Sequence, residues 1–449
     1  MNNTRRYLPS GKSARTNLLL KNVLASTLVK GWSAVVVLLM VPLTLNCLGT
    51  YRNGVWLTIS SMLVWIDQMD IGLGNGLRNS LAAYVAHGNV DKARRLISST
   101  MAMLVCIMMP ILLVLLLLIW QTDVYDFFNV SQAAIPELRT ALLAAVVLVC
   151  ITFVLKFIGN VYMGMQLPAV SNLLIALGQT LALIATALLY YTHQATFLLI
   201  VAVNTAAPLL VYLLSYPYTF YRRFRELRPS WQLVNLRSAL ELANIGIKFF
   251  WLQVAGIIQF MTANILISKF FTPEMVTPYQ ITYRYMSLVI VGFTVICMPF
   301  WNATTDAYER GDMPWIRNAS HRLATITVLI AATLIVMVVV SPWVYSLWIG
   351  DACEIPEGMT SLMALYVYLQ VLSMRYSYFL NGMGALRLQL YMTVMTIIFI
   401  PLAWFVSKET QDIRWLMAVM CICIAPSIIV NMIQFTKVLK GKATGAWRI

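Results

Sequence analysis

Hydrophobic runs long enough to cross a membrane recur along the whole chain, and they constrain its fold more than any other feature. A spanning helix needs about 20 mostly apolar residues. Because backbone polar groups inside lipid must be satisfied within their own segment, such runs are expected to be helices. We predict twelve spans, at residues 22–45, 54–73, 97–120, 138–163, 169–191, 196–220, 246–270, 277–301, 323–347, 359–380, 388–406 and 413–436.

The Lys and Arg residues fall in alternate gaps between these runs. The gap after the first run has only Arg52, whereas the arm before it has Arg5, Arg6, Lys12, Arg15 and Lys21. Basic residues favour cytoplasmic loops. The alternation therefore predicts twelve spans with both termini in the cytoplasm, and we expect a multi-pass protein of the bacterial inner membrane.

The composition agrees with a membrane protein. Hydrophobic residues make up 60% of the 449 residues and charged residues 11%, against about 25% charged in soluble domains. The first run is too long, and lies behind too long a basic arm, to be a cleaved signal peptide, so we interpret it as a retained span. The net charge of +15 follows from the cytoplasmic bias of Lys and Arg, and we do not expect nucleic-acid binding.

A basic, proline-broken gap near the middle of the chain divides it into two halves. The predicted parts are a cytoplasmic basic arm, an N-lobe with six spans, a cytoplasmic linker, a C-lobe with six spans and a cytoplasmic tail, at residues 1–21, 22–220, 221–245, 246–436 and 437–449. We predict an all-α polytopic membrane protein, with two six-helix lobes related by pseudo-two-fold symmetry around a central cavity.

A weak internal repeat supports this division. The spacing between Gly88 and Gly311 also separates identical pairs of residues before and after them, and it aligns Asn89 with Asp312; the identical pairs are Asn79 and Asn302, Arg94 and Arg317, and Trp120 and Trp343. With six spans in each half, both copies would face the same way across the membrane.

Signatures of catalysis and of cofactor binding are missing from the sequence. It has no G-x-x-x-x-G-K-[ST] phosphate loop, no G-x-S-x-G and no H-E-x-x-H motif. Its seven cysteines include no C-x-x-C pair. We therefore predict a secondary transporter with no catalytic residues, no metal and no cofactor.

A few charges lie inside the predicted spans, where an isolated charge costs about 2.5 to 3.5 kcal/mol even on the lenient insertion scale. Lys30 lies about two turns into the first span, and Asp67 and Asp70 lie at similar depth on one face of the second. Two interpretations stay open. Lys30 pairs with Asp67 or Asp70 and holds the spans together, or it lines a central cavity where a carboxylate tunes it or carries a coupling proton.

Arg284 lies inside the eighth predicted span with no acidic residue within a turn of it. Its planar guanidinium suits phosphate groups. The alternative is that the side chain extends to the membrane surface among Tyr283 and Tyr285.

Further polar residues in the spans are secondary candidates. Lys248 and Arg375 are better explained as anchors at the cytoplasmic interface, and Gln253 and Gln280 would suit a hydroxyl-rich substrate or helix–helix hydrogen bonds. Prolines are predicted to interrupt six spans, at Pro42, Pro110, Pro208, Pro299, Pro401 and Pro426.

Two motifs in the first hundred residues resemble the polysaccharide transporter family. They are Leu48-Gly-Thr-Tyr-Arg-Asn-Gly-Val-Trp and Asp70-Ile-Gly-Leu-Gly-Asn-Gly-Leu-Arg-Asn, followed by Ala86-His-Gly-Asn-Val-Asp-Lys-Ala-Arg-Arg. This family comprises the O-antigen, capsule and exopolysaccharide repeat-unit flippases of the multidrug/oligosaccharidyl-lipid/polysaccharide superfamily.

The resemblance implies a lipid-linked oligosaccharide flippase that works by alternating access. Its cargo would be an undecaprenyl-pyrophosphate-linked oligosaccharide, received in a cationic cavity. Lys30 and Arg284 match that pattern in residue type and approximate place. Polysaccharide polymerase and chain-length machinery would be its partners, and H⁺ or Na⁺ would be the coupling ion.

The sequence leaves rivals open. A drug/cation antiporter of the same superfamily would favour acidic cavity residues, yet Asp67 and Asp70 are as numerous as Lys30 and Arg284. A lipid II-type flippase more often has fourteen spans. A membrane glycosyltransferase or polymerase would need a large outer loop, and the longest one, residues 121–137, offers little beyond Asp123 and Asp126.

Overall fold

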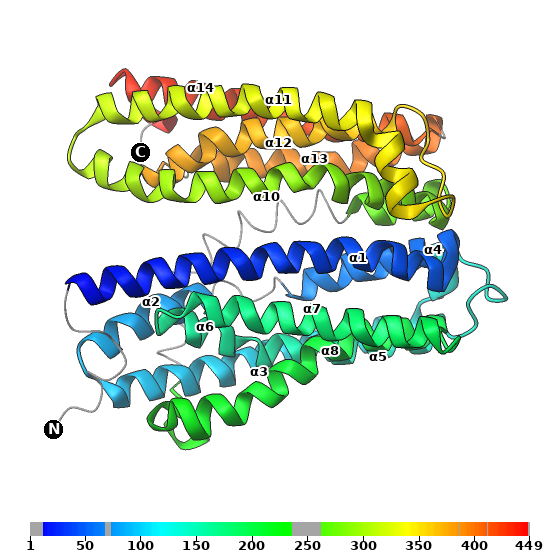
Figure 1. The fold of residues 1–449 in the computed structure, drawn as a ribbon, viewed down its shortest axis with the longest axis horizontal. Coiled ribbons are helices and arrows are strands. Elements are labelled where there is room, and N and C mark those ends of the chain that lie inside the picture. The colour runs from blue at the N-terminus through cyan, green and yellow to red at the C-terminus, as the bar shows by residue number, and fades with distance from the viewer. Residues whose placement is uncertain (1–11, 68–72, 236–261, 386, 411, 448–449) are drawn as a thin grey trace. The chain divides into compact units, whose positions relative to one another are not determined.

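Helices joined by short turns make up the described chain. The computed structural model describes residues 12–67, 73–235, 262–385, 387–410 and 412–447 (Figure 1). The chain divides into two compact units, unit 1 (Met1–Phe250) and unit 2 (Trp251–Ile449). The first part of the predicted linker, up to residue 235, therefore belongs to unit 1.

Unit 1 is a bundle in which α1 packs along α7, α7 along α8, and α8 along α5. A stack of Phe157 and Phe220, with ring centroids 6.0 Å apart, lies in its core. Its helices are α1 (Lys12–Asp67), α2 (Leu73–Ala86), α3 (Val90–Gln121), α4 (Val124–Phe128), α5 (Leu138–Leu155), α6 (Phe157–Gly164), α7 (Pro168–Tyr191) and α8 (Phe197–Pro217).

Unit 2 is a second bundle, in which α12 packs against α10, α11 and α14. Phe379 of α12 packs against Phe435 of α14, with ring centroids 5.2 Å apart. After a helical segment at 262–270, its helices are α10 (Pro273–Glu309), α11 (Met313–Ile349), α12 (Met359–Gly382), α13 (Arg387–Thr410) and α14 (Ile413–Leu439).

Helix α1 contains the first predicted span and the described part of the second, up to Asp67. Gly49 breaks it into two arms, with φ 69° and ψ 171°, a conformation that is open almost only to glycine. Figure 1 shows the chain reversing direction at this break. The two spans are therefore separated by a single non-helical residue rather than by the predicted gap of several residues.

Eight helices within the described residues are long and apolar enough to cross a membrane, and the one at Leu24–Ile66 includes both arms of α1. At five predicted proline positions the proline lies inside a helix that continues past it, so it does not end the helix, and bending there stays a prediction. Neighbouring groups can satisfy the carbonyl that each proline leaves free. The five are Pro42, Pro110, Pro208, Pro401 and Pro426.

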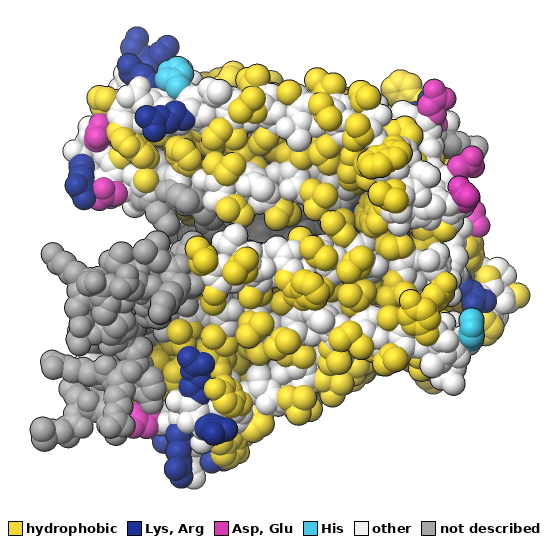
Figure 2. All heavy atoms as spheres, in the orientation of Figure 1, with side chains coloured by type: hydrophobic (Ala, Val, Ile, Leu, Met, Phe, Trp, Pro, Cys, Tyr) yellow, Lys and Arg dark blue, Asp and Glu magenta, His cyan; other side chains and the backbone are white. Residues whose placement is uncertain are grey.

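The surface of each unit is that of a membrane protein. Figure 2 shows, for each unit, charged side chains gathered at the helix ends and hydrophobic side chains along the length between them. On α3, for example, Leu113 and Leu117 are exposed, and on α11 Val336 and Val339. Such large apolar surfaces fit lipid rather than water.

Matching glycine turns precede α3 in unit 1 and α11 in unit 2. Gly88 and Gly311 both have φ 74°. The next residue donates its backbone N–H five residues back in both turns, from Asn89 to Tyr84 (2.9 Å) and from Asp312 to Ala307 (2.8 Å). This shared turn agrees with the internal repeat, which stays a prediction.

A close helix contact made by a glycine occurs in both units. A Cβ atom at Gly164 would lie 2.9 Å from Leu81 Cδ2, and one at Gly382 would lie 2.9 Å from Thr304 Cβ. Leu81 and Thr304 are separated by the same number of residues as Gly88 and Gly311. Each unit thus uses a glycine to bring one helix end against the helix before the turn.

The two repeats differ in one respect. In unit 1 a short helix, α2, precedes the turn, whereas in unit 2 α10 runs without a described break from Pro273 to Glu309. The sequence of unit 1 has Gly72, Gly74 and Gly76 at this point, whereas the equivalent stretch of unit 2 has no glycine and contains Pro299, through which α10 continues.

Candidate functional site

Arg284 lies on α10, about three turns from the start of the helix. The helix begins where Thr272 leaves the helical conformation and Pro273 occupies a first-turn position, which suits proline because its missing N–H would be unpaired there anyway. The stretch Pro273–Cys297 is apolar enough to cross a membrane. Arg284 is therefore a charge within a candidate membrane span.

The backbone around Arg284 is held firmly. Ser287 Oγ donates to the carbonyl of Arg284 (3.1 Å), and Tyr285 Oη donates to the carbonyl of Met337 on α11 (3.2 Å). The ring of Tyr285 also packs edge-on against Tyr345, with centroids 5.4 Å apart. These contacts fix the rotation of α10 against α11, and hence the direction in which the Arg284 side chain leaves the helix.

Arg284 is half-buried as a residue, and within the described part of the chain its guanidinium forms no ion pair or hydrogen bond. Arginine keeps its charge at physiological pH and offers five N–H donors in a planar fork. A charge without a partner in a spanning segment usually faces a wet cavity or a substrate. The arrangement can thus receive an anionic group such as a phosphate.

Lys30 lies on the first arm of α1, in unit 1. Its side chain is exposed, and it contacts no acidic group among the residues that the structure describes. The arm is fixed to α7 next to it, where Trp32 Nε1 donates to Thr180 Oγ1 (3.0 Å). α1 ends at Asp67, but the side chain of Asp67 and the whole of Asp70 lie outside the described residues, so the predicted pairing with Lys30 stays a prediction.

Of the four secondary candidates for the site, two contact other parts of the protein and two lie outside the residues that the structure describes. Gln280 is buried and donates to Asn264 Oδ1 (2.8 Å), which is a helix–helix contact. Arg375 on α12 is half-buried, its guanidinium lies 4.9 Å from the ring centroid of Tyr376, and its Nη2 donates to the carbonyl of Ser320 (3.4 Å). Lys248 and Gln253 lie outside the described residues.

One buried polar cluster was not predicted. On α14, Gln434 is fully buried, and neither of its amide atoms is hydrogen-bonded within the described part of the chain. Asn431 donates to Ser377 Oγ on α12 (3.2 Å), while its Oδ1 has no partner among those residues. Asn431 and Gln434 are three residues apart, so they share a helix face. That spacing was the only sequence signal, because their burial depends on how α12 packs.

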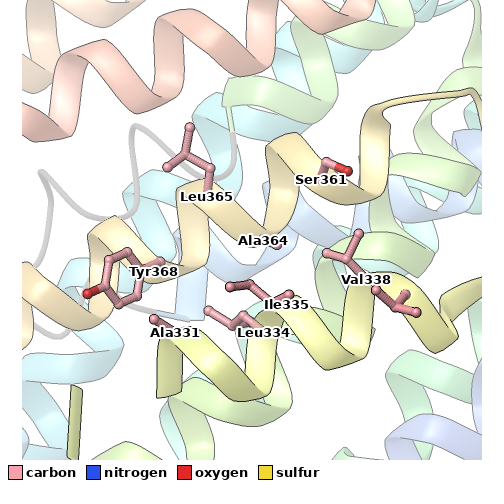
Figure 3. A pocket seen from close by; sticks show the side chains of 9 residues that line it. Ala331, Leu334, Ile335, Val338, Ser361, Ala364, Leu365 and Tyr368 are labelled. Carbon is pink, nitrogen blue, oxygen red and sulfur yellow. The ribbon is translucent and has the colours of Figure 1, made fainter. Parts of the chain in front are cut away.

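An apolar groove of about 370 Å³ lies between α11 and α12. Figure 3 shows side chains from both helices along it; its lining is Ala331, Leu334, Ile335, Val338, Val339, Ser361, Ala364, Leu365 and Tyr368. Because Ile335 and Val339 are exposed in a candidate span, lipid chains can cover it. Among the described residues, no three His, Cys, Asp or Glu side chains come close enough to hold a metal ion.

Comparisons with known proteins extend these observations to the whole fold. No protein-family model and no curated protein sequence matches the chain. Solved structures do match. One is an inward-facing conformation of a multidrug resistance MATE family transporter of the MOP superfamily, with 16% identity, a TM-score of 0.69, and 95% of this chain and 99% of that chain covered.

Two further structures give the same result. A MATE structure in the straight conformation has 15% identity and a TM-score of 0.64, covering 95% of this chain and 96% of the other. An outward-facing MATE family transporter has 15% identity and a TM-score of 0.54, covering 93% and 97%. At these identities the likeness concerns the fold alone. It confirms the predicted fold class, an all-α polytopic membrane protein, and the chain has the fold of MATE transporters over nearly its whole length.

Proposed function

We propose that the chain is a secondary transporter that moves undecaprenyl-pyrophosphate-linked oligosaccharide repeat units across the bacterial inner membrane by alternating access. The observation that carries this proposal is the Arg284 guanidinium, which has no partner among the described residues, in a candidate spanning helix of a transporter fold. A pyrophosphate cannot enter hydrocarbon alone, and cations inside the protein lower the free energy of bringing it in. Lys30, exposed on α1, is the second candidate cation.

The proposal is tested by glycan export in cells that depend on this chain. Arg284→Gln removes the charge and is expected to lower export at least about ten-fold, equivalent to roughly 1.4 kcal/mol. Arg284→Lys keeps the charge but loses the planar fork, so export should be partly retained. Surface glycan is measured at matched protein level.

Arg317→Gln is the matched control, because Arg317 is exposed near the start of α11, outside the apolar part of that helix. It should export normally. Normal export by both Arg284→Gln and Lys30→Ala would contradict the cationic-cavity proposal.

A drug/cation antiporter is the second candidate, and the fold comparison favours it, since the similar solved structures include multidrug resistance transporters. A cationic substrate would be repelled by Arg284 and attracted by Asp67 or Asp70, which are also the candidate sites for H⁺ or Na⁺ coupling.

The two candidates predict opposite results in one assay. For an antiporter, Asp67→Asn or Asp70→Asn should abolish efflux of a lipophilic cation such as ethidium from cells, and Arg284→Gln should leave it intact. For the flippase, ethidium efflux should not exceed that of cells without the protein. Polysaccharide polymerase and chain-length machinery are partners of the flippase only.

A further inference from the structure

A short basic segment follows the last helix of unit 1. It comprises residues 218–235, and we name it the docked segment. It contains one π-helical turn (Tyr218–Arg223) and two 3-10 turns (Arg225–Leu227 and Trp231–Leu233). The candidate span of α8 continues to Arg223, so the π-helical turn of the docked segment forms the end of that span and the rest of the segment follows it.

The docked segment is bound to α3 by hydrogen bonds from three places along its length. The N–H of Ser230 donates to Ser98 Oγ (3.0 Å), the N–H of Asn235 donates to Ser99 Oγ (2.8 Å), and Arg94 Nε donates to the carbonyl of Arg228 (2.9 Å). Ser98 and Ser99 are buried. The docked segment is therefore held in place on unit 1 rather than being a free tether.

Exposed arginines lie along the docked segment. Arg222, Arg225 and Arg228 are exposed, and the Arg228 guanidinium lies 4.2 Å from the ring centroid of Tyr221, a cation–π distance that orients it. The only acidic residue of the docked segment is Glu226, which is also exposed. A fourth arginine, Arg223, lies 5.6 Å from the ring of Tyr162.

Large aromatic side chains are exposed beside these arginines. The exposed fractions are 73% for Trp231, 54% for Tyr221 and 51% for Tyr218. Trp231 also lines a small cleft together with Pro229 of the docked segment and Tyr216 of α8. Figure 2 shows dark-blue side chains beside hydrophobic ones at the end of α8.

We propose that the docked segment binds the headgroups of anionic phospholipids. Tryptophan and tyrosine prefer the headgroup level of a membrane, and a cluster of basic residues directly after a spanning helix attracts anionic lipid. The docked segment combines both features at the end of α8. The guanidinium fork suits the phosphate and the aromatic rings suit the glycerol and upper acyl region.

The hydrogen bonds to α3 distinguish the docked segment from a flexible basic loop, which attracts anionic lipid by charge alone. A free segment would lose conformational entropy on binding, whereas the backbone of the docked segment is already held by Ser98 and Ser99. The Arg228 guanidinium is also oriented by Tyr221. Binding should therefore show preference for lipid over a soluble anion, which cannot use the aromatic side chains.

The test compares lipid binding to the purified full-length chain and to a variant with Arg222→Gln, Arg225→Gln and Arg228→Gln. Binding of phosphatidylglycerol and phosphatidylcholine in detergent micelles is titrated by native mass spectrometry. Each arginine near a lipid surface contributes roughly a five-fold factor, so the triple variant should bind phosphatidylglycerol at least about ten-fold more weakly. Phosphatidylcholine binding should not change.

The control variant has Arg310→Gln, Arg317→Gln and Arg322→Gln, three exposed arginines of unit 2 at the start of α11 or just before it. It should bind phosphatidylglycerol like the wild type. Equal binding by the wild type and the triple variant of the docked segment, or an equal loss in both triple variants, would overturn the proposal.

A second variant protects the test against misfolding. Tyr221→Ala with Trp231→Ala leaves every charge in place, and it should weaken phosphatidylglycerol binding several-fold. Circular dichroism and size-exclusion chromatography check that all variants fold. Displacement of phosphatidylglycerol by millimolar inorganic phosphate or by a short RNA would show a general anion site and overturn the lipid assignment.

Discussion

Single residues in unit 2 set how closely its helices approach, and Gly382 is the sharpest case. A Cβ there would lie 2.9 Å from Thr304 Cβ and 3.0 Å from the carbonyl oxygen of Trp301. Neither atom is the end of a flexible side chain. We expect Gly382→Ala to lower the free energy of unfolding by about 1 to 3 kcal/mol, the usual cost of overpacking. Thermal unfolding of the purified protein measures this.

Gly292 supplies the matched control, because it also lies on a helix of unit 2 but a Cβ there would have no heavy atom within 4 Å. Gly292→Ala should be neutral or stabilise by up to about 1 kcal/mol, since alanine favours a helix. Equal melting temperatures for the two variants would show that the close approach at Gly382 does not matter.

Asp412 couples stability to pH at the start of α14. Its carboxylate accepts from the N–H of Arg414 (2.9 Å) and lies 2.8 Å from Arg414 Nη2. These hydrogen bonds lower the pKa of Asp412 below its ordinary value. A pKa lowered on folding stabilises the fold above the unfolded pKa of about 3.9, and that contribution is lost as pH falls through the folded value.

We therefore expect Asp412→Ala to destabilise by about 1 kcal/mol at pH 7, the typical value of a helix cap, and Asp412→Asn to destabilise less because asparagine also caps. The difference in melting temperature between wild type and Asp412→Asn should shrink between pH 5 and about pH 3. A difference that stays constant over this range would mean that the carboxylate charge contributes nothing.

At the scale of a helix, the break in α1 depends on one backbone conformation. Gly49 has φ 69° and ψ 171°, yet a Cβ there would have open space around it. The strain of Gly49→Ala would therefore be conformational, about 1 to 3 kcal/mol. Gly31→Ala lies on the same helix, also in open space, and should not destabilise. Thermal unfolding of both variants separates backbone strain from side-chain crowding.

Helix lengths were only partly predictable from the sequence. Hydropathy located the spans because lipid demands long apolar segments, but it set the start of the third span at residue 97, whereas α3 begins at Val90. The extra turns are basic, and their helix is stabilised by the preceding Gly88 turn. Likewise α10 continues past the predicted end at 301 to Glu309, because the chain there has no helix-breaking glycine.

Candidate site residues were predictable in type but not in environment. A charge inside a span is visible in the sequence, so Arg284 could be singled out. Whether it has a partner depends on neighbouring helices, as does the burial of Gln434, which has no charge to mark it. For Gln280 the sequence left two roles open, substrate binding and helix–helix hydrogen bonding, and the structure shows a hydrogen bond to Asn264.

At the scale of the whole chain, the repeated turn predicts the membrane topology. Lys92 and Arg310 lie next to the two turns, whereas Asp123 and Asp351 lie just beyond the far ends of α3 and α11. Single cysteines at these positions, in a background without the native cysteines, would be labelled with a membrane-impermeant maleimide. We expect Asp123→Cys and Asp351→Cys to react in intact cells, and Lys92→Cys and Arg310→Cys only after permeabilisation, because basic residues favour the cytoplasmic side.

Whether Lys92→Cys and Arg310→Cys react from the same side of the membrane tests the repeat, independently of which side that is. Reaction of Lys92→Cys and Arg310→Cys from opposite sides would rule out a parallel repeat. Reaction of all four from the sides opposite to those expected would keep the repeat and reverse the orientation of the termini.

The matching turns at Gly88 and Gly311 also make part of the chain interchangeable. Both turns have the same φ at glycine and the same backbone hydrogen bonds, so each four-residue stretch starts the next helix in the same backbone conformation. We therefore expect that His87-Gly-Asn-Val and Arg310-Gly-Asp-Met can be exchanged between the two units without loss of folding.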